Sequence, residues 1–161
     1  MLNTRDITLN DAELICSHRH AMFEASSKPR DRELAQMATP FHDWLLPQLS
    51  SGKYFGFVTE IETTPVASIG LMTIDWPPHP LHPTSDRRGY VLNMYVEPEF
   101  RGRGIARNLL KLSEVAFSER NIQYAVLHST SKGQSFYENN GWSSTPEMAK
   151  IIRPAEIQNQ T

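Results

Sequence analysis

The chain has 161 residues, a net charge of −2, and apolar and charged fractions of 39% and 21%, typical of a soluble globular protein. This length suits one domain with a sizeable core. The slightly negative charge favours neither nucleic acid nor an anionic membrane as a partner, and one cysteine, Cys16, excludes an internal disulfide. Because there is no signal-peptide core and no apolar run that could span a bilayer, we expect a soluble cytoplasmic protein.

The N-terminal segment predicts a short strand and then a helix. Residues 5–9 alternate polar and apolar side chains, and Asn10 or Asp11 can cap the helix that follows. His18 lies on or near the apolar stripe of this helix. A histidine in that position is more often a hydrogen-bonded core residue than a catalytic base.

A second helical region is expected over residues 32–49, after a polar break at 26–30. Thr39 followed by Pro40 is typical of a helix start, so this region is predicted to consist of two pieces. The apolar side chains of the second piece form either part of the core or a wall of a substrate pocket, and they are Phe41, Trp44 and Leu45.

The middle of the chain predicts a pair of strands and a long loop. Residues 54–61 and 66–74 have strand character and are joined by a short turn. Residues 75–88 are rich in proline and histidine, which opposes regular structure. His79 and His82 could suggest a metal site, but no cysteine or third histidine accompanies them. We therefore expect a solvated loop that can cover a pocket.

The most informative stretch lies between residues 90 and 120. Residues 90–96 form an apolar, β-prone run that Pro98 ends, because proline cannot donate to a sheet ladder. Gly102 and Gly104 follow, and a helical pattern then runs over residues 104–120. The pattern predicts a strand, a short glycine turn and a long helix.

The start of this helix has the features of an anion site. Its first N–H groups have no partner within the helix, and the helix dipole favours negative charge there. The usual Asp or Glu is replaced by Arg101, Arg103 and Arg107. A phosphate or pyrophosphate is the natural ligand. The stretch lacks the Gly-Lys-Ser or Gly-Lys-Thr of a P-loop, and it lacks the third glycine of a dinucleotide fingerprint.

The C-terminal third predicts one more strand and helix pair. Residues 123–129 form an apolar strand, which strand–helix–strand order places parallel to the strand before the helix. Ser131 and Gln134 match a capping box for a helix that ends at Gly141. Residues 147–152 suggest a last strand. We expect one domain over residues 1–154, followed by a polar tail at 155–161.

Two motifs resemble the GNAT N-acetyltransferase superfamily. Arg101-Gly102-Arg103-Gly104-Ile105-Ala106, preceded by Val96 and Pro98, is similar to the acyl-CoA motif of that family. Phe136-Tyr137-Glu138-Asn139-Asn140-Gly141-Trp142 is similar to its second signature, with tryptophan in place of the usual phenylalanine. The resemblance implies an α/β fold, the GNAT acyl-CoA N-acyltransferase fold, with a mixed central sheet flanked by helices.

The same resemblance implies acetyl-CoA as co-substrate and no metal. It places a general acid for the departing CoA thiolate at Tyr137, whose phenol has an unperturbed pKa of about 10, near that of an alkyl thiol. Thr130 stands where the family often has an asparagine that contacts CoA. The cofactor-binding set that the resemblance implies is Met94, Tyr95, Val96, Arg101, Gly102, Arg103, Gly104, Ile105, Ala106 and Thr130.

The resemblance implies transfer of an acetyl group to a primary amine by direct attack, with a small-molecule acceptor preferred. A peptide or protein amine, or a non-catalytic acyl-CoA-binding module, are the alternatives. The base is left open among residues near strand ends, and a homodimer is also left open because many relatives dimerise. The candidate bases are Asp75, Asn93, Glu97 and His128.

Overall fold

A five-stranded mixed sheet with flanking helices forms the centre of the protein. The strands are β1 (Leu2–Asp6), β2 (Tyr54–Ile61), β3 (Thr64–Asp75), β4 (Arg87–Val96) and β5 (Ala125–Leu127), and the α-helices are α1 (Ala12–Glu24), α2 (Asp31–Ser50), α3 (Ile105–Glu119) and α4 (Gln134–Glu138). This computed structural model describes residues 1–26 and 31–152. The strands lie side by side in chain order, antiparallel from β1 to β4 and parallel between β4 and β5. The predicted α/β fold and its parallel β4–α3–β5 unit are confirmed.

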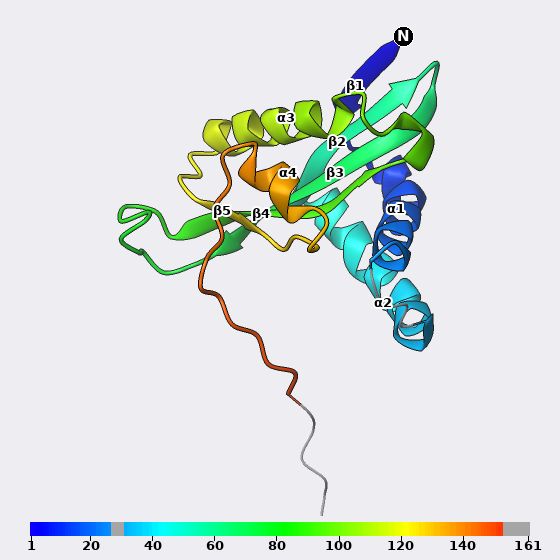
Figure 1. The fold of residues 1–161 in the computed structure, drawn as a ribbon. Coiled ribbons are helices and arrows are strands. Elements are labelled where there is room, and N and C mark those ends of the chain that lie inside the picture. Colours follow the sequence, from blue (N-terminus) through cyan, green and yellow to red (C-terminus); the bar gives the residue numbers. More distant parts are fainter. Residues whose placement is uncertain (27–30, 153–161) are drawn as a thin grey trace, which may run out of the picture.

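The helices cover both faces of the sheet (Figure 1), with α3 on one face and α1 and α2 on the other. Successive side chains of a strand point to opposite faces, so each strand supplies both layers of the core. Ile69 and Leu71 of β3 pack with Leu109 of α3, and Tyr54 of β2 packs with Ile15 of α1. We call these the α3 side and the α1/α2 side.

The first strand begins and ends earlier than predicted. It covers Leu2–Asp6 rather than residues 5–9, because a 3-10 helix at Leu9–Asp11 takes the chain out of the sheet. The Asp11 carboxylate stabilises this turn by accepting hydrogen bonds from the Thr8 backbone N–H (2.7 Å) and from two guanidinium nitrogens of Arg5.

Helix α2 is one continuous helix, so the predicted break at Pro40 is wrong. A proline removes one helical hydrogen bond. Both Pro40 and Pro47 lie on the exposed side of α2, where water can satisfy the carbonyl that each leaves free. Leu34 and Leu45 are buried on the opposite side and hold the helix against the rest of the protein. Most of the predicted polar break at 26–30 lies outside the described residues.

Strand β4 contains a bulge at Asn93. Residues 68 and 70 of β3 face Tyr95 and Leu92 of β4, so β4 has one extra residue at this point. Asn93 lies at this extra position, and its φ is +34°. As a result, the side chains of the neighbours Leu92 and Asn93 both contact the α1/α2 side.

The C-terminal part departs most from the sequence prediction. Strand β5 is shorter than residues 123–129, and α4 is capped at Gly133 rather than by a Ser131–Gln134 box, because the Gln134 side chain binds Glu138 and Ser144 instead. Residues 147–152 form no strand, because they pair with no strand of the described chain. The domain limit at 154 and the tail lie outside the described residues.

The loop between β3 and β4 is irregular as predicted, but His82 in it is buried rather than solvated. Its Nε2 accepts a hydrogen bond from Nε of Arg88 (2.9 Å), and its Nδ1 lies 3.0 Å from the carbonyl oxygen of Ser85. Both ring nitrogens therefore have a partner, one in the loop and one at the start of β4. Among the described residues, no helix is long and apolar enough to cross a membrane.

Candidate active site

The turn between β4 and α3 brings two glycines in the left-handed region to the start of the long helix. Gly102 and Gly104 have φ values of +75° and +79°, which residues with a side chain rarely adopt. Gly104 is the N-cap of α3, no side chain caps the helix, and its first turn has no acidic residue. A Cβ at either glycine would meet no atom within 4 Å. The N–H groups of this helix end are therefore open to an anion.

The three arginines of this turn carry charge that the described chain does not neutralise. Nε of Arg101 donates to the carbonyl oxygen of Val96 (2.9 Å), and Nη2 of Arg103 donates to that of Glu99 (3.1 Å). Arg107 is exposed on α3. Within residues 1–26 and 31–152, none of the three forms an ion pair with a carboxylate. Ile105 and Ala106 turn their side chains toward the core, so they can offer a ligand only their backbone.

Strands β4 and β5 separate before β4 ends. They pair only where Gly89–Val91 faces Ala125–Leu127, although β4 continues to Val96. The bulge at Asn93 lies at the start of the unpaired part. The predicted cofactor-binding residues Met94, Tyr95 and Val96 follow it, and β5 does not pair with their backbone in the described chain. A ligand can add to such a free edge as an extra strand would.

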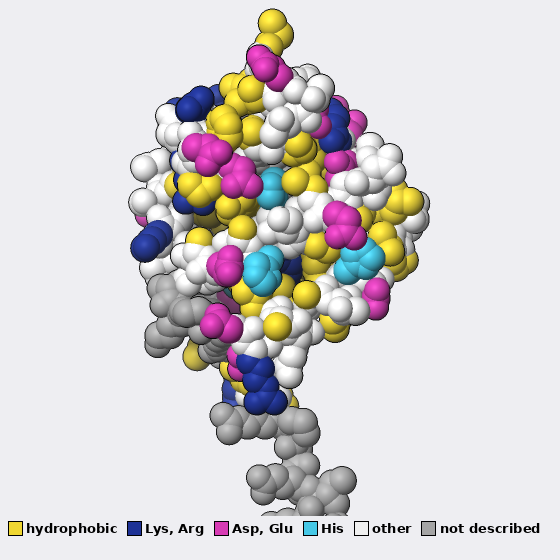
Figure 2. Space-filling view, turned by 90° about the vertical axis from the view of Figure 1, so that its right-hand side faces the viewer, with side chains coloured by type: hydrophobic (Ala, Val, Ile, Leu, Met, Phe, Trp, Pro, Cys, Tyr) yellow, Lys and Arg dark blue, Asp and Glu magenta, His cyan; other side chains and the backbone are white. Residues whose placement is uncertain are grey.

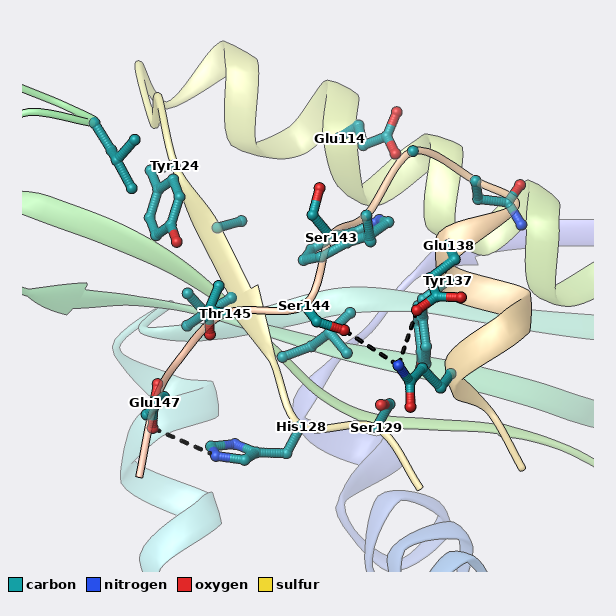
Figure 3. A pocket seen from close by; sticks show the side chains of 18 of the residues that line it. Glu114, Tyr124, His128, Ser129, Tyr137, Glu138, Ser143, Ser144, Thr145 and Glu147 are labelled. Carbon is teal, nitrogen blue, oxygen red and sulfur yellow. Dashed lines mark hydrogen bonds and ion pairs between the residues drawn. The ribbon is translucent and has the colours of Figure 1, made fainter. Parts of the chain in front are cut away.

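Tyr137 of α4 lies at a cavity of about 780 Å³, lined by β5, α4 and residues 140–149. Figure 3 shows Tyr137 on the α4 side of this cavity, with His128 and Glu147 beyond the end of β5. Burial raises the pKa of Tyr137 to about 12. Its hydroxyl makes no hydrogen bond within the described residues and is protonated at neutral pH, and its role as a general acid stays a prediction.

Thr130, the other predicted cofactor contact outside the turn, is exposed in the loop before α4. Its Oγ1 accepts a hydrogen bond from the backbone N–H of Gly133 (3.2 Å). This side chain therefore stabilises the local turn, and its role toward CoA stays a prediction.

The α1/α2 side of the bulge holds a buried polar network that the sequence did not reveal. Asn93 donates from Nδ2 to the Tyr54 hydroxyl (2.9 Å), and its Oδ1 accepts a hydrogen bond from Nη1 of Arg19. The three residues come from β4, β2 and α1. Asn93 was a candidate base because it lies near a strand end, whereas no sequence signal pointed to Arg19 or Tyr54.

His18 is a buried, hydrogen-bonded core residue, as interpreted from the sequence. The side chain is 2% exposed, and a hydrogen bond joins its Nδ1 to Oγ of Ser68 (2.7 Å). Burial lowers its pKa to about 4, although Oε1 of Glu97 lies 3.6 Å from Nε2. That distance is too long for a hydrogen bond, so the ring stays neutral at pH 7.

The four candidate bases lie apart from one another. Asp75 is at the far end of β3, opposite Arg87, and Asn93 belongs to the buried network. Glu97 is half exposed beside His18. His128 lies just beyond β5, with Nδ1 against the Tyr90 hydroxyl and Nε2 3.5 Å from Oε1 of Glu147. The structure therefore does not bring these residues together as one cluster.

The surface agrees with the small net charge. On the face drawn in Figure 2, acidic, basic and histidine side chains are interspersed with apolar ones. Among the described residues, no group of three or more His, Cys, Asp or Glu side chains could hold a metal ion.

Comparison with known proteins identifies the fold and the family. Residues 52–144 match the model of the acetyltransferase (GNAT) domain. A GCN5-related N-acetyltransferase from Ralstonia eutropha JMP134 is 50% identical, with a TM-score of 0.92 over 94% of this chain and 99% of that chain. A predicted acetyltransferase from Clostridium acetobutylicum, solved with acetyl-CoA, is 28% identical, with a TM-score of 0.80 over 94% of this chain and 96% of that chain.

More distant structures share the fold alone. A ribosomal-protein-alanine N-acetyltransferase from Brucella melitensis biovar Abortus 2308 is 19% identical, with a TM-score of 0.66 over 96% of this chain and 100% of that chain. No curated protein matches the chain. The domain match covers more than half of the sequence and contains the glycine turn, the separating strands and Tyr137, so the chain belongs to the GNAT acetyltransferase family.

Proposed function

We propose that the protein transfers the acetyl group of acetyl-CoA to the primary amine of a small molecule by direct attack. One observation carries this proposal: the open N-terminus of α3 and the unpaired edge of β4 meet at the same end of the sheet. A phosphate-bearing chain with a long polar arm fits such a pair of features. The crystal structure of the 28% identical relative, which was solved with acetyl-CoA, supports the choice of ligand.

In the proposed complex, the backbone does most of the cofactor binding. The N–H groups between Arg101 and Ala106 would hold the pyrophosphate, and the three arginines would add positive charge. The pantetheine arm would add to the free edge of Met94–Val96. A backbone N–H near Tyr95 or Val96 would polarise the thioester carbonyl and stabilise the oxyanion.

The reaction forms one C–N bond and breaks one C–S bond. A neutral amine attacks the thioester carbon, the tetrahedral oxyanion collapses, and the thiolate leaves with a proton from the Tyr137 hydroxyl. Solvent then restores that proton. The attacking amine loses its own proton to water or to a side chain at the acceptor side, for which Glu97 and His128 remain the candidates.

The acceptor class is the finer part of the proposal. A peptide or protein amine is the second candidate, and a module that binds acyl-CoA without turnover is the third. The presence of both glycines and of Tyr137 favours catalysis over the third candidate. Homodimer formation and a cytoplasmic location stay predictions.

Calorimetric titration of the purified protein with acetyl-CoA, with NAD and ATP as controls, tests the proposal. We expect a 1:1 isotherm with acetyl-CoA alone, followed by amine-dependent release of free thiol. Binding of ATP or NAD in place of acetyl-CoA would reject the assignment of the turn. Binding of acetyl-CoA without thiol release for any amine would favour the non-catalytic module.

A further inference from the structure

Arg19 is a half-buried cation on the α1/α2 side of the bulge. It projects from α1, and its guanidinium carbon lies 4.9 Å from the ring centre of Phe23 and 4.4 Å from that of Phe41. These two rings shield the charge from water. A guanidinium in such surroundings interacts more strongly with an anion than one in bulk solvent does.

The hydrogen bonds of Arg19 leave donors unused. Nη1 donates to Oδ1 of Asn93, and the bond from Asn93 to Tyr54 fixes the orientation of that amide. Nε is buried and has no hydrogen-bond partner among residues 1–26 and 31–152. Within the described residues, Nη2 makes no hydrogen bond either. Asn93 therefore fixes the position of the guanidinium while leaving two of its nitrogens unpaired.

Within the described part of the chain, the charge of Arg19 is also unpaired. No carboxylate of residues 1–26 and 31–152 lies within 4 Å of it, and the connection between α1 and α2, residues 25–30, reads Ala-Ser-Ser-Lys-Pro-Arg and contains no acid. Burial lowers the pKa of Arg19, and the nearby groups that oppose this shift are Tyr54 and Cys16 rather than a carboxylate.

Arg5 shows how this chain stabilises an arginine for a structural purpose. It lies 2.8 Å from Oδ1 of Asp11 and 2.8 Å from Oε1 of Glu60. The contrast is informative because a desolvated charge without a counter-ion is destabilising. Such a residue indicates that the counter-ion comes from outside the chain.

The position of Arg19 connects it with the reaction. Its partner Asn93 is the bulge residue, directly before the edge of Met94–Val96 at which we place the thioester. Arg19 reaches this point from the α1/α2 side, and the glycine turn leads into α3 on the opposite face. An acceptor that binds Arg19 would thus meet the thioester from the side opposite α3.

We infer that Arg19 binds the acid group of the acceptor, so that the substrate is a small primary amine that also carries a carboxylate. This inference rests on the proposed function. A guanidinium binds the two oxygens of a carboxylate with parallel hydrogen bonds. A phosphate monoester has the same chemistry, and the substrate pairs below distinguish the two.

The test uses pairs of amines in which one member carries an acid group and the other is its neutral counterpart. Thiol release is measured for β-alanine and β-alaninamide, for L-amino acids and their amides, and for phosphoethanolamine and ethanolamine. We expect kcat/KM for the acids to exceed that for the matched neutral amines by at least about tenfold, the factor that one charge-assisted contact supplies. A preference for phosphoethanolamine alone would identify phosphate in place of carboxylate.

Two variants separate binding from folding. Arg19→Met keeps the apolar length of the side chain, and we expect it to reduce the acid-to-amide ratio to near one, mainly by raising KM for the acid. The control is Arg120→Met, because Arg120 also lies over a phenylalanine ring, 3.8 Å from that of Phe55, but on the α3 side. It should keep the ratio of the wild type.

The outcomes are distinguishable from failure of the proposed function. Acetyl-CoA titration of each variant reports the cofactor site independently, and loss of binding in the wild type would reject that function. If acetyl-CoA binds but amides and acids react equally, or no acidic amine reacts, Arg19 does not bind the acceptor. An unchanged ratio in Arg19→Met, with a lowered melting temperature, would show that Arg19 only joins α1 to α2.

Discussion

The two sides of the bulge at Asn93 are built differently. On the α3 side, the buried cluster between sheet and helix consists of aliphatic and aromatic side chains, and the proposed ligand contacts are backbone N–H groups at two glycines. On the α1/α2 side, polar side chains are buried close together. They include His18, Ser68, Tyr54 and Asn93, and Arg19 lies beside them.

This difference matches two different tasks. The proposed cofactor can be held by backbone groups, whose geometry depends on a turn and not on many side chains. An acceptor has to be distinguished from other amines, and that requires side chains with a defined charge and hydrogen-bond pattern. We therefore expect substitutions on the α3 side to affect acetyl-CoA and chemistry, and those on the other side to affect selectivity and stability.

The largest effect on activity is expected when the hydroxyl group is removed from a tyrosine, and we compare two tyrosines on opposite sides of the bulge. Tyr137→Phe should lower kcat by about 10² because it removes the proposed acid, and it should leave stability almost unchanged because that hydroxyl has no partner in the described chain. Tyr54→Phe should lower the free energy of unfolding by about 1 kcal/mol because Asn93 loses its hydrogen-bond partner. Steady-state kinetics measures kcat and urea unfolding measures the free energy of unfolding for each variant. An equal fall in kcat in the two variants would contradict the role of Tyr137 as the acid.

Substitutions of two glycines test whether the turn before α3 binds acetyl-CoA. Gly104→Val places a side chain where φ is +79°, and we expect acetyl-CoA affinity to fall roughly 30-fold because the side chain blocks the approach to the helix end. Gly52 in the turn between α2 and β2 is the matched control, since its φ is +72° and it too has no atom within 4 Å of an added Cβ. Calorimetry should find Gly52→Val unaffected in affinity. A similar loss in both variants would attribute the effect to strain.

The smallest expected effect is the pH dependence of stability that His18 contributes on the α1/α2 side. His18 has a pKa of about 4 when folded and 6.5 when unfolded, so the unfolded chain binds a proton first as the pH falls. The stabilisation is complete above pH 6.5 and is lost toward pH 4. We expect the free energy of unfolding to drop by about 2 kcal/mol between pH 7 and pH 5 through this residue alone.

Two histidines of the same helix isolate that contribution. In His18→Gln, the fall in stability between pH 7 and pH 5 should be smaller by that amount. His20→Gln should keep the wild-type pH dependence, because His20 is exposed and close to Glu24 on the surface. Urea unfolding at several pH values gives the slopes. Parallel slopes in the two variants would mean that His18 does not stay neutral when buried.

The sequence predicted correctly those elements that depend on interactions between residues close together in the chain, and it failed where distant contacts decide the structure. The strand at Tyr54–Ile61 and the turn into α3 depend on neighbouring residues, and both are confirmed. The break predicted in α2 is wrong because burial of one helix face outweighs two prolines on the other. The last strand, predicted at 147–152, is absent because an apolar segment forms a strand only beside another strand, and this segment pairs with none in the described chain.

The sequence by itself determined the local structure on which the proposed cofactor side of this protein rests. Strand, proline, glycine turn and helix follow one another within about twenty residues, so their chemistry can be read without knowing the fold. Only the tertiary structure decided the acceptor side, because Arg19, Tyr54 and Asn93 lie far apart in the chain and meet when α1, β2 and β4 pack together. Burial then gives an ordinary arginine its unpaired charge, and no local pattern encodes that property.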